Sequence, residues 1–368
     1  MSVASARAAR PVRVLVVDDS HFVRRALARL LASDPRVAVA GEAADGDAAL
    51  DRLLALEPDV VTLDVEMPGQ DGLATLEAIM RRRPTPVLMV SARTAAGAHV
   101  TLRALAQGAV DFVTKPDGSV SMDLGALRDE LIAKVLAAAS VRGRSLRPPI
   151  DGRRDRAPRP PEVQAVRRAP RCGVAIGAST GGVMALQAVL AKLRAPLEAP
   201  VFVAQHMPAH FTAAFAQLLE DSTGLPAREA RDGEPVQPGR VYVAPGGRHL
   251  TVVAGGAGAQ GARLCVSDEP AAITLRPSVN RLFESVARVY GAGAVAVVLT
   301  GMGNDGTDGL AAVKAAGGIA LCQDESTSVV YGMPGSAVRA GLADVVAPVG
   351  RLGEEIGRAI DALARARR

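Results

Sequence analysis

The sequence predicts an α/β protein with two domains, and three observations lead to this prediction. First, 49% of the 368 residues are apolar and 22% are charged, a balance that excludes a disordered chain. Second, short apolar, β-branched runs alternate with helical stretches in both halves of the chain. Third, residues 137–170 are rich in arginine and proline and have no apolar period, which is typical of an extended linker. We therefore expect domains at residues 11–136 and 171–368, joined by this linker.

The first domain is predicted to contain five successive strand–helix units. The expected strands are VRVLVV (12–17), VAVAGEA (37–43), DVVTL (59–63), PVLMVS (86–91) and AVDFVT (109–114). The expected helices lie near residues 21–32, 46–56, 72–82, 97–107 and 123–139. Apolar strands that alternate with helices are typical of a parallel sheet covered on both faces, so this domain is predicted to be a flavodoxin-like (βα)5 fold.

The second domain is predicted to be a doubly wound, mostly parallel sheet with an antiparallel hairpin insertion. Four continuous apolar runs, each followed by a helical pattern, predict its parallel strands: CGVAIGA (172–178), PVFVAQ (200–205), AVAVVLT (294–300) and GIALC (318–322). Between them lie runs spaced like hairpin strands: VYVAP (241–245), LTVVA (250–254) and RLCVS (263–267).

The net charge of +5 suggests a polyanionic partner until its location is considered. Residues 141–170 contain nine arginines and no lysine against three carboxylates, a surplus of +6, so the rest of the chain carries about −1. The stretch has no aromatic residues on which bases could stack. We therefore expect the charge to belong to a solvated linker and expect no nucleic-acid partner.

The composition also predicts a cytoplasmic protein without membrane insertion. No apolar run approaches the roughly 20 residues of a membrane-spanning helix, and the first ten residues do not lead into an apolar leader segment. The three cysteines are too few and too scattered for a disulfide framework or a zinc site. The oligomeric state is left open by the sequence.

Polar residues follow the strands of the first domain at the points where those strands end. Asp18 and Asp19 follow the first strand, Asp64 ends the third, Ser91 ends the fourth and Lys115 follows the fifth. The carboxyl ends of parallel strands meet at one edge of a sheet, so these side chains are expected to cluster. A single aspartate at a strand end usually caps a turn or a helix, but the whole set predicts a Mg²⁺ and phosphoryl site with Asp64 as acceptor.

With this set of residues, the first domain resembles the receiver domains of response regulators. The resemblance is carried by V-V-D-D-S (16–20), L-D-V-E-M-P (63–68), Ser91 and T-K-P (114–116). Gln70 stands where a methionine is expected, a departure that concerns packing.

The receiver resemblance implies a role for each matching residue. It implies that Mg²⁺ is held by Asp18, Asp19, Asp64 and the backbone carbonyl of Glu66. It implies that a histidine kinase phosphorylates Asp64. It also implies that Ser91 and Lys115 bind the phosphoryl group, with Phe112 as the aromatic switch residue.

A serine in the second domain has the sequence context of a nucleophile. Ser179 is the central residue of G-A-S-T-G (177–181), which follows an apolar strand and precedes a helical run. Small neighbours allow a sharp turn that exposes the hydroxyl beside a helix N-terminus, where N–H groups can hold an oxyanion. The stretch lacks the Gly-Lys-Ser/Thr ending of a P-loop and the spacing of a dinucleotide-binding loop.

The base and the acid are expected at the ends of other parallel strands. His206 directly follows the strand at 200–205, and Asp305 lies shortly after the strand at 294–300, which would bring both to the edge that carries Ser179. His210 falls in the next predicted helix and is expected on the surface or in packing.

A second triad would match the chain order Ser, acid, His of α/β-hydrolases. It would combine Ser179 with Asp232 and His249. Both partners lie in turn sequences, RDGEPV and GGRHLTVV, so we favour His206 and Asp305.

The second domain resembles the chemotaxis protein-glutamate methylesterase (CheB) family. The resemblance is carried by A-I-G-A-S-T-G-G (175–182), Q-H-M-P (205–208), R-P-S-V (276–279), L-T-G-M-G-N-D-G (299–306) and Y-G-M-P (331–334). It implies Ser179 as nucleophile, His206 as base and Asp305 as acid, with Thr180 beside the nucleophile and Met302 near the oxyanion, and no cofactor in this domain. One departure is Asn280, where an aspartate is expected.

The resemblance implies a function in sensory adaptation. The expected substrates are glutamate methyl esters of methyl-accepting chemotaxis receptors, with methanol as product, and specific receptor glutamines, which would be deamidated. The unphosphorylated receiver domain is expected to cover the active-site face, and phosphorylation to release it.

Two other classes of protein share part of this pattern. A DNA-binding response regulator would also have a receiver domain, but the second domain here shows no helix-turn-helix and is not basic. A different serine hydrolase, such as a small esterase or peptidase, would share the triad but would have no reason to carry a phosphorylation switch.

Overall fold

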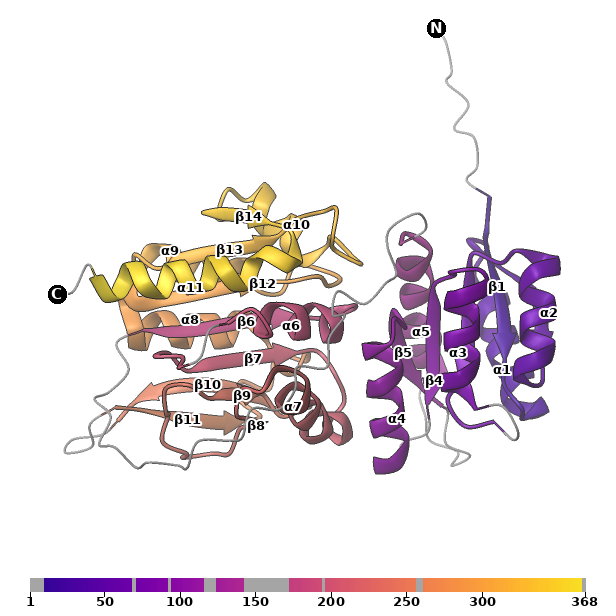
Figure 1. Cartoon of the computed structure of the whole chain (residues 1–368), viewed down its shortest axis with the longest axis horizontal. Helices are drawn as coiled ribbons and strands as arrows, with labels where there is room; N and C mark the ends of the chain where they lie inside the picture. Colours follow the sequence, from indigo (N-terminus) through magenta and orange to yellow (C-terminus); the bar gives the residue numbers. More distant parts are fainter. Residues whose placement is uncertain are drawn as a thin grey trace, which may run out of the picture. The chain divides into compact units, whose positions relative to one another are not determined.

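The computed structural model describes seven stretches of the chain, which form two compact units (Figure 1). These stretches are residues 10–67, 71–91, 94–115, 124–141, 172–193, 196–255 and 261–365. Gln70, Pro116 and all of the predicted linker beyond residue 141 lie outside them. In the stretches that are described, no helix combines the length and the apolar character needed to cross a membrane.

The first unit is a five-stranded parallel sheet in the order β2-β1-β3-β4-β5, the flavodoxin-like order. Its strands are β1 (Val12–Val17), β2 (Val37–Ala43), β3 (Val60–Asp64), β4 (Val87–Ser91) and β5 (Asp111–Thr114). Its helices are α1 (His21–Ala32), α2 (Gly46–Leu56), α3 (Gly72–Arg82), α4 (Ala95–Ala106) and α5 (Leu124–Ala139). The predicted (βα)5 fold is confirmed. Because α5 continues to Ala139, the first three residues of the predicted linker belong to that helix.

Local sequence explains why helices begin soon after these strands. Strands β3 and β4 are buried along their whole length, as the continuous apolar runs predicted. The side chains of Ser20, Asp45, Asp71 and Thr94 each accept a backbone N–H from the first turn of the helix that follows. The cap at Ser20 starts α1 directly after the Asp18–Asp19 pair and so holds that pair at the end of β1.

The second unit is a seven-stranded sheet in the order β14-β13-β12-β6-β7-β9-β8, and all its pairings are parallel. Its strands are β6 (Gly173–Ala178), β7 (Val201–Gln205), β8 (Ala227–Glu229), β9 (Val241–Val243), β12 (Ala294–Val298), β13 (Ile319–Gln323) and β14 (Val345–Ala347). A separate antiparallel hairpin consists of β10 (His249–Ala254) and β11 (Ala262–Ser267). The predicted fold class, a mostly parallel sheet with an antiparallel insertion, is confirmed.

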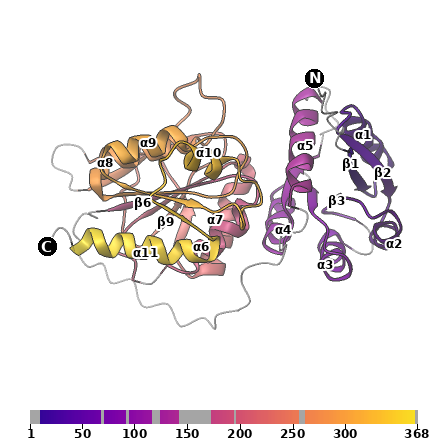
Figure 2. The same ribbon diagram turned by 90° about the horizontal axis from the view of Figure 1, so that it is seen from above.

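Helices cover both faces of the seven-stranded sheet. They are α6 (Gly182–Leu190), α7 (Ala209–Thr223), α8 (Val279–Tyr290), α9 (Thr307–Ala315), α10 (Met333–Arg339) and α11 (Val349–Arg365), with a short 3-10 turn at Gly291–Gly293. Figure 2 shows α8, α9 and α10 on one face and α6 and α11 on the other. The buried core on the α8 side also includes apolar residues of the β10–β11 hairpin.

One predicted strand belongs to a different part of the sheet than its spacing suggested. The run VYVAP contains β9, which pairs in parallel with β7 and β8 and is not part of the antiparallel insertion. All three residues of β9 are buried, which is the pattern of a parallel strand covered on both faces. Strands β8 and β14 were not predicted, because three residues are too few for a periodic signal.

The chain order of the strands places a topological switch point between β6 and β12. From β6 the chain continues to β7 on one side, and it later crosses back to β12 on the other side. In open α/β sheets, ligands bind at the carboxyl ends of the strands where the order reverses in this way. Residues that follow β6 and β12 therefore lie where a parallel sheet builds its binding site.

Candidate active site and acidic cluster

Ser179 lies in a tight turn between β6 and α6. Its N–H donates to the carbonyl of Thr300, at 3.0 Å, and its own carbonyl accepts the side-chain amide of Gln205, at 2.9 Å. Gly181 enters α6 with φ +78°, and an added Cβ there would lie 2.6 Å from the side chain of Val329. The turn is therefore fixed on both sides, while Ser179 itself is only partly buried.

The loop after β12 packs directly against this turn. A Cβ added at Gly301 would lie 2.8 Å from Cβ of Ser179 and 3.1 Å from its backbone nitrogen. The hydroxyl of Thr300 contacts the carbonyl of Thr180, at 2.9 Å. Both strand ends of the switch point therefore meet at Ser179, and a glycine is needed at 301 for that approach.

His206 leaves β7 beside Ser179 because β6 and β7 are paired up to Ala178 and Gln205. Its backbone N–H continues this pairing by donating to the carbonyl of Ala178, at 3.1 Å. Its ring atom Nε2 lies 2.9 Å from Oδ2 of Asp305. The side chains of His206 and Asp305 are 12% and 10% exposed, so the pair is largely shielded from water.

The carboxylate of Asp305 also receives the N-terminus of α8. Oδ2 accepts the N–H of Val279 at 2.8 Å, and Oδ1 accepts the N–H of Asn280 at 2.9 Å and the hydroxyl of Ser278 at 3.2 Å. Burial alone would raise the pKa of Asp305, but the hydrogen bonds from His206, Asn280 and Val279 outweigh it and lower the pKa. Asp305 is therefore held as a charged acceptor toward His206.

The alternative pair of Asp232 and His249 is not brought together. Oδ1 of Asp232 accepts the N–H of Val266 at 2.9 Å, and Nδ1 of the fully buried His249 accepts the N–H of Ser278 at 3.3 Å. Burial lowers the pKa of His249, and the guanidinium groups of Arg276 and Arg281 add to this effect. Within the described ranges, no hydrogen bond or ion pair joins Asp232 to His249.

The other sequence-predicted residues of this domain lie around the turn or beside it. Thr180 is buried next to Ser179, and Met302 is partly buried in the loop after β12. His210 lies in α7, its ring 4.5 Å from that of Phe211. Sequence reasoning missed Gln205 as the side chain that holds the Ser179 turn. The sequence did contain a signal for this residue, because Gln205 is the first residue of the motif Q-H-M-P.

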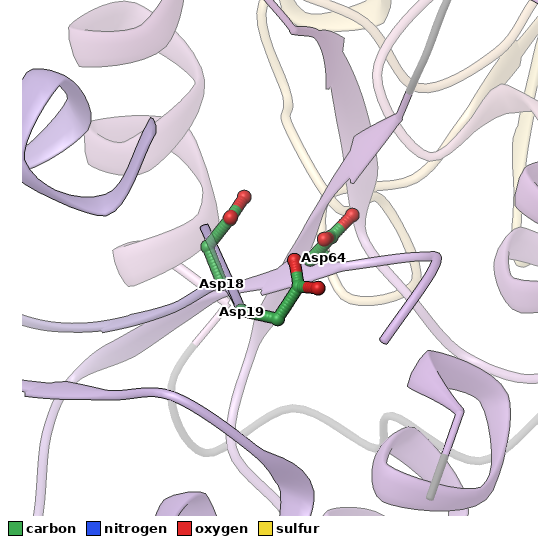
Figure 3. A group of neighbouring side chains, drawn as sticks. All are labelled: Asp18, Asp19 and Asp64. Carbon is green, nitrogen blue, oxygen red and sulfur yellow. The ribbon is translucent and has the colours of Figure 1, made fainter. Parts of the chain in front are cut away.

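The three predicted aspartates of the first domain form one cluster at the ends of β1 and β3 (Figure 3). One carboxylate oxygen from each of Asp18, Asp19 and Asp64 lies within 4.8 Å of the others. Nζ of Lys115 lies 2.6 Å from Oδ2 of Asp64 and 3.2 Å from Oδ2 of Asp18. Four side chains predicted from three separate strand ends therefore meet at one point.

The cluster concentrates negative charge in a buried position. Asp18 and Asp64 are fully buried, and Asp19 is exposed. Burial, together with the charge of Asp18, raises the pKa of Asp64 to about 6 even though Lys115 acts against this rise. Closely spaced carboxylate oxygens are the ligands of a hard divalent cation, and such a cation would relieve the repulsion. The residues present therefore fit Mg²⁺.

The remaining predicted residues of the first domain surround this cluster. Ser91 is buried, and its Oγ lies 2.7 Å from Oγ1 of Thr101. Phe112 is buried with its ring centroid 5.1 Å from Nζ of Lys134. The N–H of Glu66 donates to Oδ1 of Asp64 at 3.2 Å, which fixes the backbone just after the acceptor. The contacts of Thr101 and Lys134 were not predicted, because they depend on how α4 and α5 pack.

Comparison with known proteins gives matches to both domains. Residues 14–122 match the family model of the response regulator receiver domain, and residues 174–356 match that of the CheB methylesterase. The protein-glutamate methylesterase/protein-glutamine glutaminase of Symbiobacterium thermophilum is 48% identical over 97% of this chain and 99% of its own length. A protein of the same name from Geobacillus kaustophilus is 46% identical over 92% of this chain and 96% of its own length. The crystal structure of the Thermotoga maritima CheB methylesterase catalytic domain covers 51% of this chain and 97% of its own, with 38% identity and a TM-score of 0.49.

These findings define the class of protein first: a response regulator whose receiver domain precedes an α/β domain with a serine, a histidine and an aspartate at its switch point. The near full-length identity then defines the family. The chain belongs to the CheB methylesterase family.

Proposed function

We propose that this protein is a phosphorylation-activated protein-glutamate methylesterase and protein-glutamine glutaminase that acts on chemotaxis receptors. Ser179 is its nucleophile, His206 its general base and Asp305 the acid that orients His206. The observation that carries the proposal is the contact between Nε2 of His206 and Oδ2 of Asp305, beside the partly exposed turn of Ser179 at the switch point. The names of the full-length relatives supply the substrate class.

The proposed reaction begins with the attack of Ser179 Oγ on the side-chain carbonyl carbon of a glutamate methyl ester. The serine proton passes to Nδ1 of His206, because Nε2 is bound to Asp305. The carbon–oxygen bond to the methoxy group then breaks, and His206 gives its proton to the leaving oxygen to form methanol. A water molecule deprotonated by His206 then attacks the acyl carbon, the bond from that carbon to Ser179 Oγ breaks, and His206 returns the proton to Ser179, which leaves a glutamate carboxylate on the receptor.

Asp305 supports these reaction steps through its negative charge. Hydrogen bonds from the first turn of α8 keep its pKa low, so it stays ionised while His206 becomes an imidazolium. An ionised partner fixes the ring orientation and stabilises the imidazolium that forms during the attack.

The negative oxygen of the tetrahedral intermediate needs donors on the other side of the carbonyl. We assign this role to backbone N–H groups near Thr180, at the start of α6, and near Met302, in the loop after β12. Both segments adjoin Ser179 through Gly301 and Thr300. Loss of one such donor lowers kcat by roughly 10²–10³-fold in serine hydrolases.

Deamidation uses the same site. With a glutamine side chain, the bond that breaks is carbon–nitrogen, and His206 protonates the leaving amine so that ammonia departs. Both reactions leave a carboxylate and thus add one negative charge to the receptor.

Control comes from the receiver domain in this proposal. Asp64 accepts a phosphoryl group from a chemotaxis histidine kinase, and Lys115 and Ser91 bind that group. Asp18, Asp19, Asp64 and the carbonyl of Glu66 would hold Mg²⁺, which neutralises charge around the acceptor. Phosphorylation releases the catalytic domain from inhibition, with Phe112 as the switch residue.

The test is release of labelled methanol from methylated receptors. We expect release by the wild type, an increase with a small acyl phosphate as phosphodonor, and no release by Ser179→Ala. Asp64→Asn should keep the basal rate and lose the increase, and a chain that lacks residues 1–140 should exceed the unphosphorylated rate. No release by the wild type in either state would contradict the proposal and favour a serine hydrolase with another substrate.

A further inference from the structure

We propose that Asn280 is a positioning residue for Asp305, and that its neutral amide sets the charge beside the His206–Asp305 pair. This inference rests on the triad proposed above and adds a residue to it. In the sequence, Asn280 stands where an aspartate is expected. In the structure, its side chain contacts the backbone of Gly306 and Gly309.

Asn280 and Asp305 cap each other's helices. The carboxylate of Asp305 accepts the N–H groups of Val279 and Asn280, in the first turn of α8, at 2.8 and 2.9 Å. In return, Oδ1 of Asn280 accepts the N–H groups of Gly306 and Gly309, at the start of α9, at 2.8 and 2.9 Å. The first four N–H groups of a helix have no partner within it, so each side chain satisfies donors that the other helix leaves open.

The backbone of α9 needs this outside cap. Its N-cap residue is Gly306, which has φ +103° and no side chain that could accept a hydrogen bond. Asn280 therefore anchors the residue that directly follows Asp305. With Asp305 bound to α8 on one side and Gly306 bound to Asn280 on the other, the carboxylate has one position relative to His206.

The two helix ends are close enough to exclude other arrangements. A Cβ added at Gly309 would lie 2.8 Å from the carbonyl oxygen of Asn280 and 2.9 Å from its Cα. A Cβ at Gly306 would lie 2.9 Å from Cγ1 of Val279. These are contacts to backbone and to a branched side chain, so the reciprocal caps are built into a tight crossing of α8 and α9.

The amide matters because of the charges around it. An aspartate at 280 could accept the same two N–H groups, but it would place a second carboxylate beside Asp305. The titratable and charged groups around this network are His206 after β7, Asp308 in the first turn of α9, Asp305 itself, and His249 in β10 with Arg276, Arg281 and Asp268 around it. A further negative charge beside Asp305 would stabilise the imidazolium that His206 forms during the reaction, so the pH profile of the reaction would move.

The test compares Asn280→Ala and Asn280→Asp with the wild type in the full chain. The rate of covalent labelling of Ser179 by a fluorophosphonate, measured from pH 5 to 9, reports the state of His206 without any receptor. Methanol release from methylated receptors gives kcat and KM separately. Gln237→Glu is the matched charge control, because Gln237 is exposed and precedes β9, at the amino ends of the parallel strands, whereas the site lies at their carboxyl ends. Asp305→Ala tests the underlying triad.

Asn280→Ala is expected to lower the labelling rate and kcat by roughly 10- to 100-fold with KM changed by less than about threefold, as a misplaced catalytic group predicts. Asn280→Asp is expected to recover most of the rate at pH 9 and to shift the midpoint of the pH profile upward by roughly half to one unit. Gln237→Glu should not shift it.

The inference is wrong if Asn280→Ala stays within twofold of the wild type, or if the Asn280→Asp profile overlays that of the wild type. If Asn280→Ala does not fold, the pH profile of Asn280→Asp decides alone, because that variant keeps the cap. Full activity of Asp305→Ala would instead contradict the triad itself. If Asp305→Ala loses activity while both Asn280 variants behave like the wild type, only the inference on Asn280 is contradicted.

Discussion

Oδ2 of Asp305 lies 2.9 Å from Nε2 of His206, although the two residues are separated by 99 positions in the chain. The parallel sheet explains this proximity, since β7 and β12 flank β6 and both end at the edge where Ser179 lies. The contact also determines which ring nitrogen can act on Ser179. With Nε2 bound to the carboxylate, Nδ1 is the nitrogen that accepts the serine proton in the proposed reaction.

Replacement of the two candidate histidines should have opposite effects on chemistry and on stability. His206→Ala is expected to reduce methanol release by at least about 10³-fold with little change in the free energy of unfolding, because the ring serves as the base. His249→Ala is expected to retain measurable esterase activity and to destabilise the domain by roughly 1–3 kcal/mol, since it leaves a cavity and removes an acceptor from Ser278.

Both variants are compared by methanol release and by urea unfolding. Intact activity of His206→Ala would overturn its assignment as base. Complete loss in His249→Ala, in a variant that is otherwise folded, would revive the alternative triad with Asp232.

Asp305→Asn should lower the stability of the catalytic domain by an amount that depends on pH in a defined direction. The pKa of Asp305 is lowered in the folded protein, so its charge contributes stability above the ordinary value of 3.8. This contribution is lost as the pH falls through the lowered pKa. We therefore expect the variant to be less stable than the wild type at pH 7, by roughly 1–3 kcal/mol, and the difference to shrink below pH 3.8.

The measurement is urea unfolding of both proteins from pH 3 to pH 7. Asp344→Asn is a useful comparison, because its carboxylate also accepts a backbone N–H, that of Ala320, far from His206. A deficit for Asp305→Asn that grows on acidification would contradict the expected sign.

Gly301→Ala should lower activity through the position of Ser179. The added Cβ would lie 2.3 Å from Sδ of Met333 and 2.8 Å from Cβ of Ser179. The methionine can move, but the serine is held by its turn, so we expect kcat to fall by roughly 10²-fold. Gly350→Ala in α11 is the control, because nothing lies within 4 Å of its added Cβ. Equal activity of the two variants would contradict the close approach.

The features that were predicted best from the sequence are those that depend on a single structural rule and a single short segment. A parallel strand buried on both faces is a continuous apolar run, so β1, β6 and β12 could be predicted from composition alone. The residues after such runs meet at one sheet edge, which is why Ser179 and Asp64 could be proposed before any coordinates were known. VYVAP was misassigned because its spacing resembled a hairpin, whereas its buried faces decide its place in the parallel sheet.

What the sequence could not predict depends on contacts between distant segments. In the sequence, Asn280 was visible only as a departure from an expected aspartate, and its role depends on the approach of α9 to α8 at Gly309. The support of Ser179 by Gln205 likewise depends on the register of β6 and β7. Such contacts follow from packing, which no local pattern encodes.

Asp64→Asn should stabilise the receiver domain in the absence of Mg²⁺. Burial raises the pKa of Asp64 to about 6, so its charged form is disfavoured in the folded state; the wild type therefore loses stability as the pH rises from 3.8 through 6. At pH 7.5 with a chelator we expect the variant to be more stable than the wild type by roughly 1–3 kcal/mol. The stability that the lost contact with Lys115 contributed has to be subtracted from this gain. Millimolar Mg²⁺ should raise the unfolding temperature of the wild type and leave that of the variant nearly unchanged, as calorimetry of the full chains would measure. A wild type that gains nothing from Mg²⁺ would show that the three carboxylates do not form the predicted cation site, and a variant that is less stable at pH 7.5 would show that the contact with Lys115 outweighs the burial of the charge.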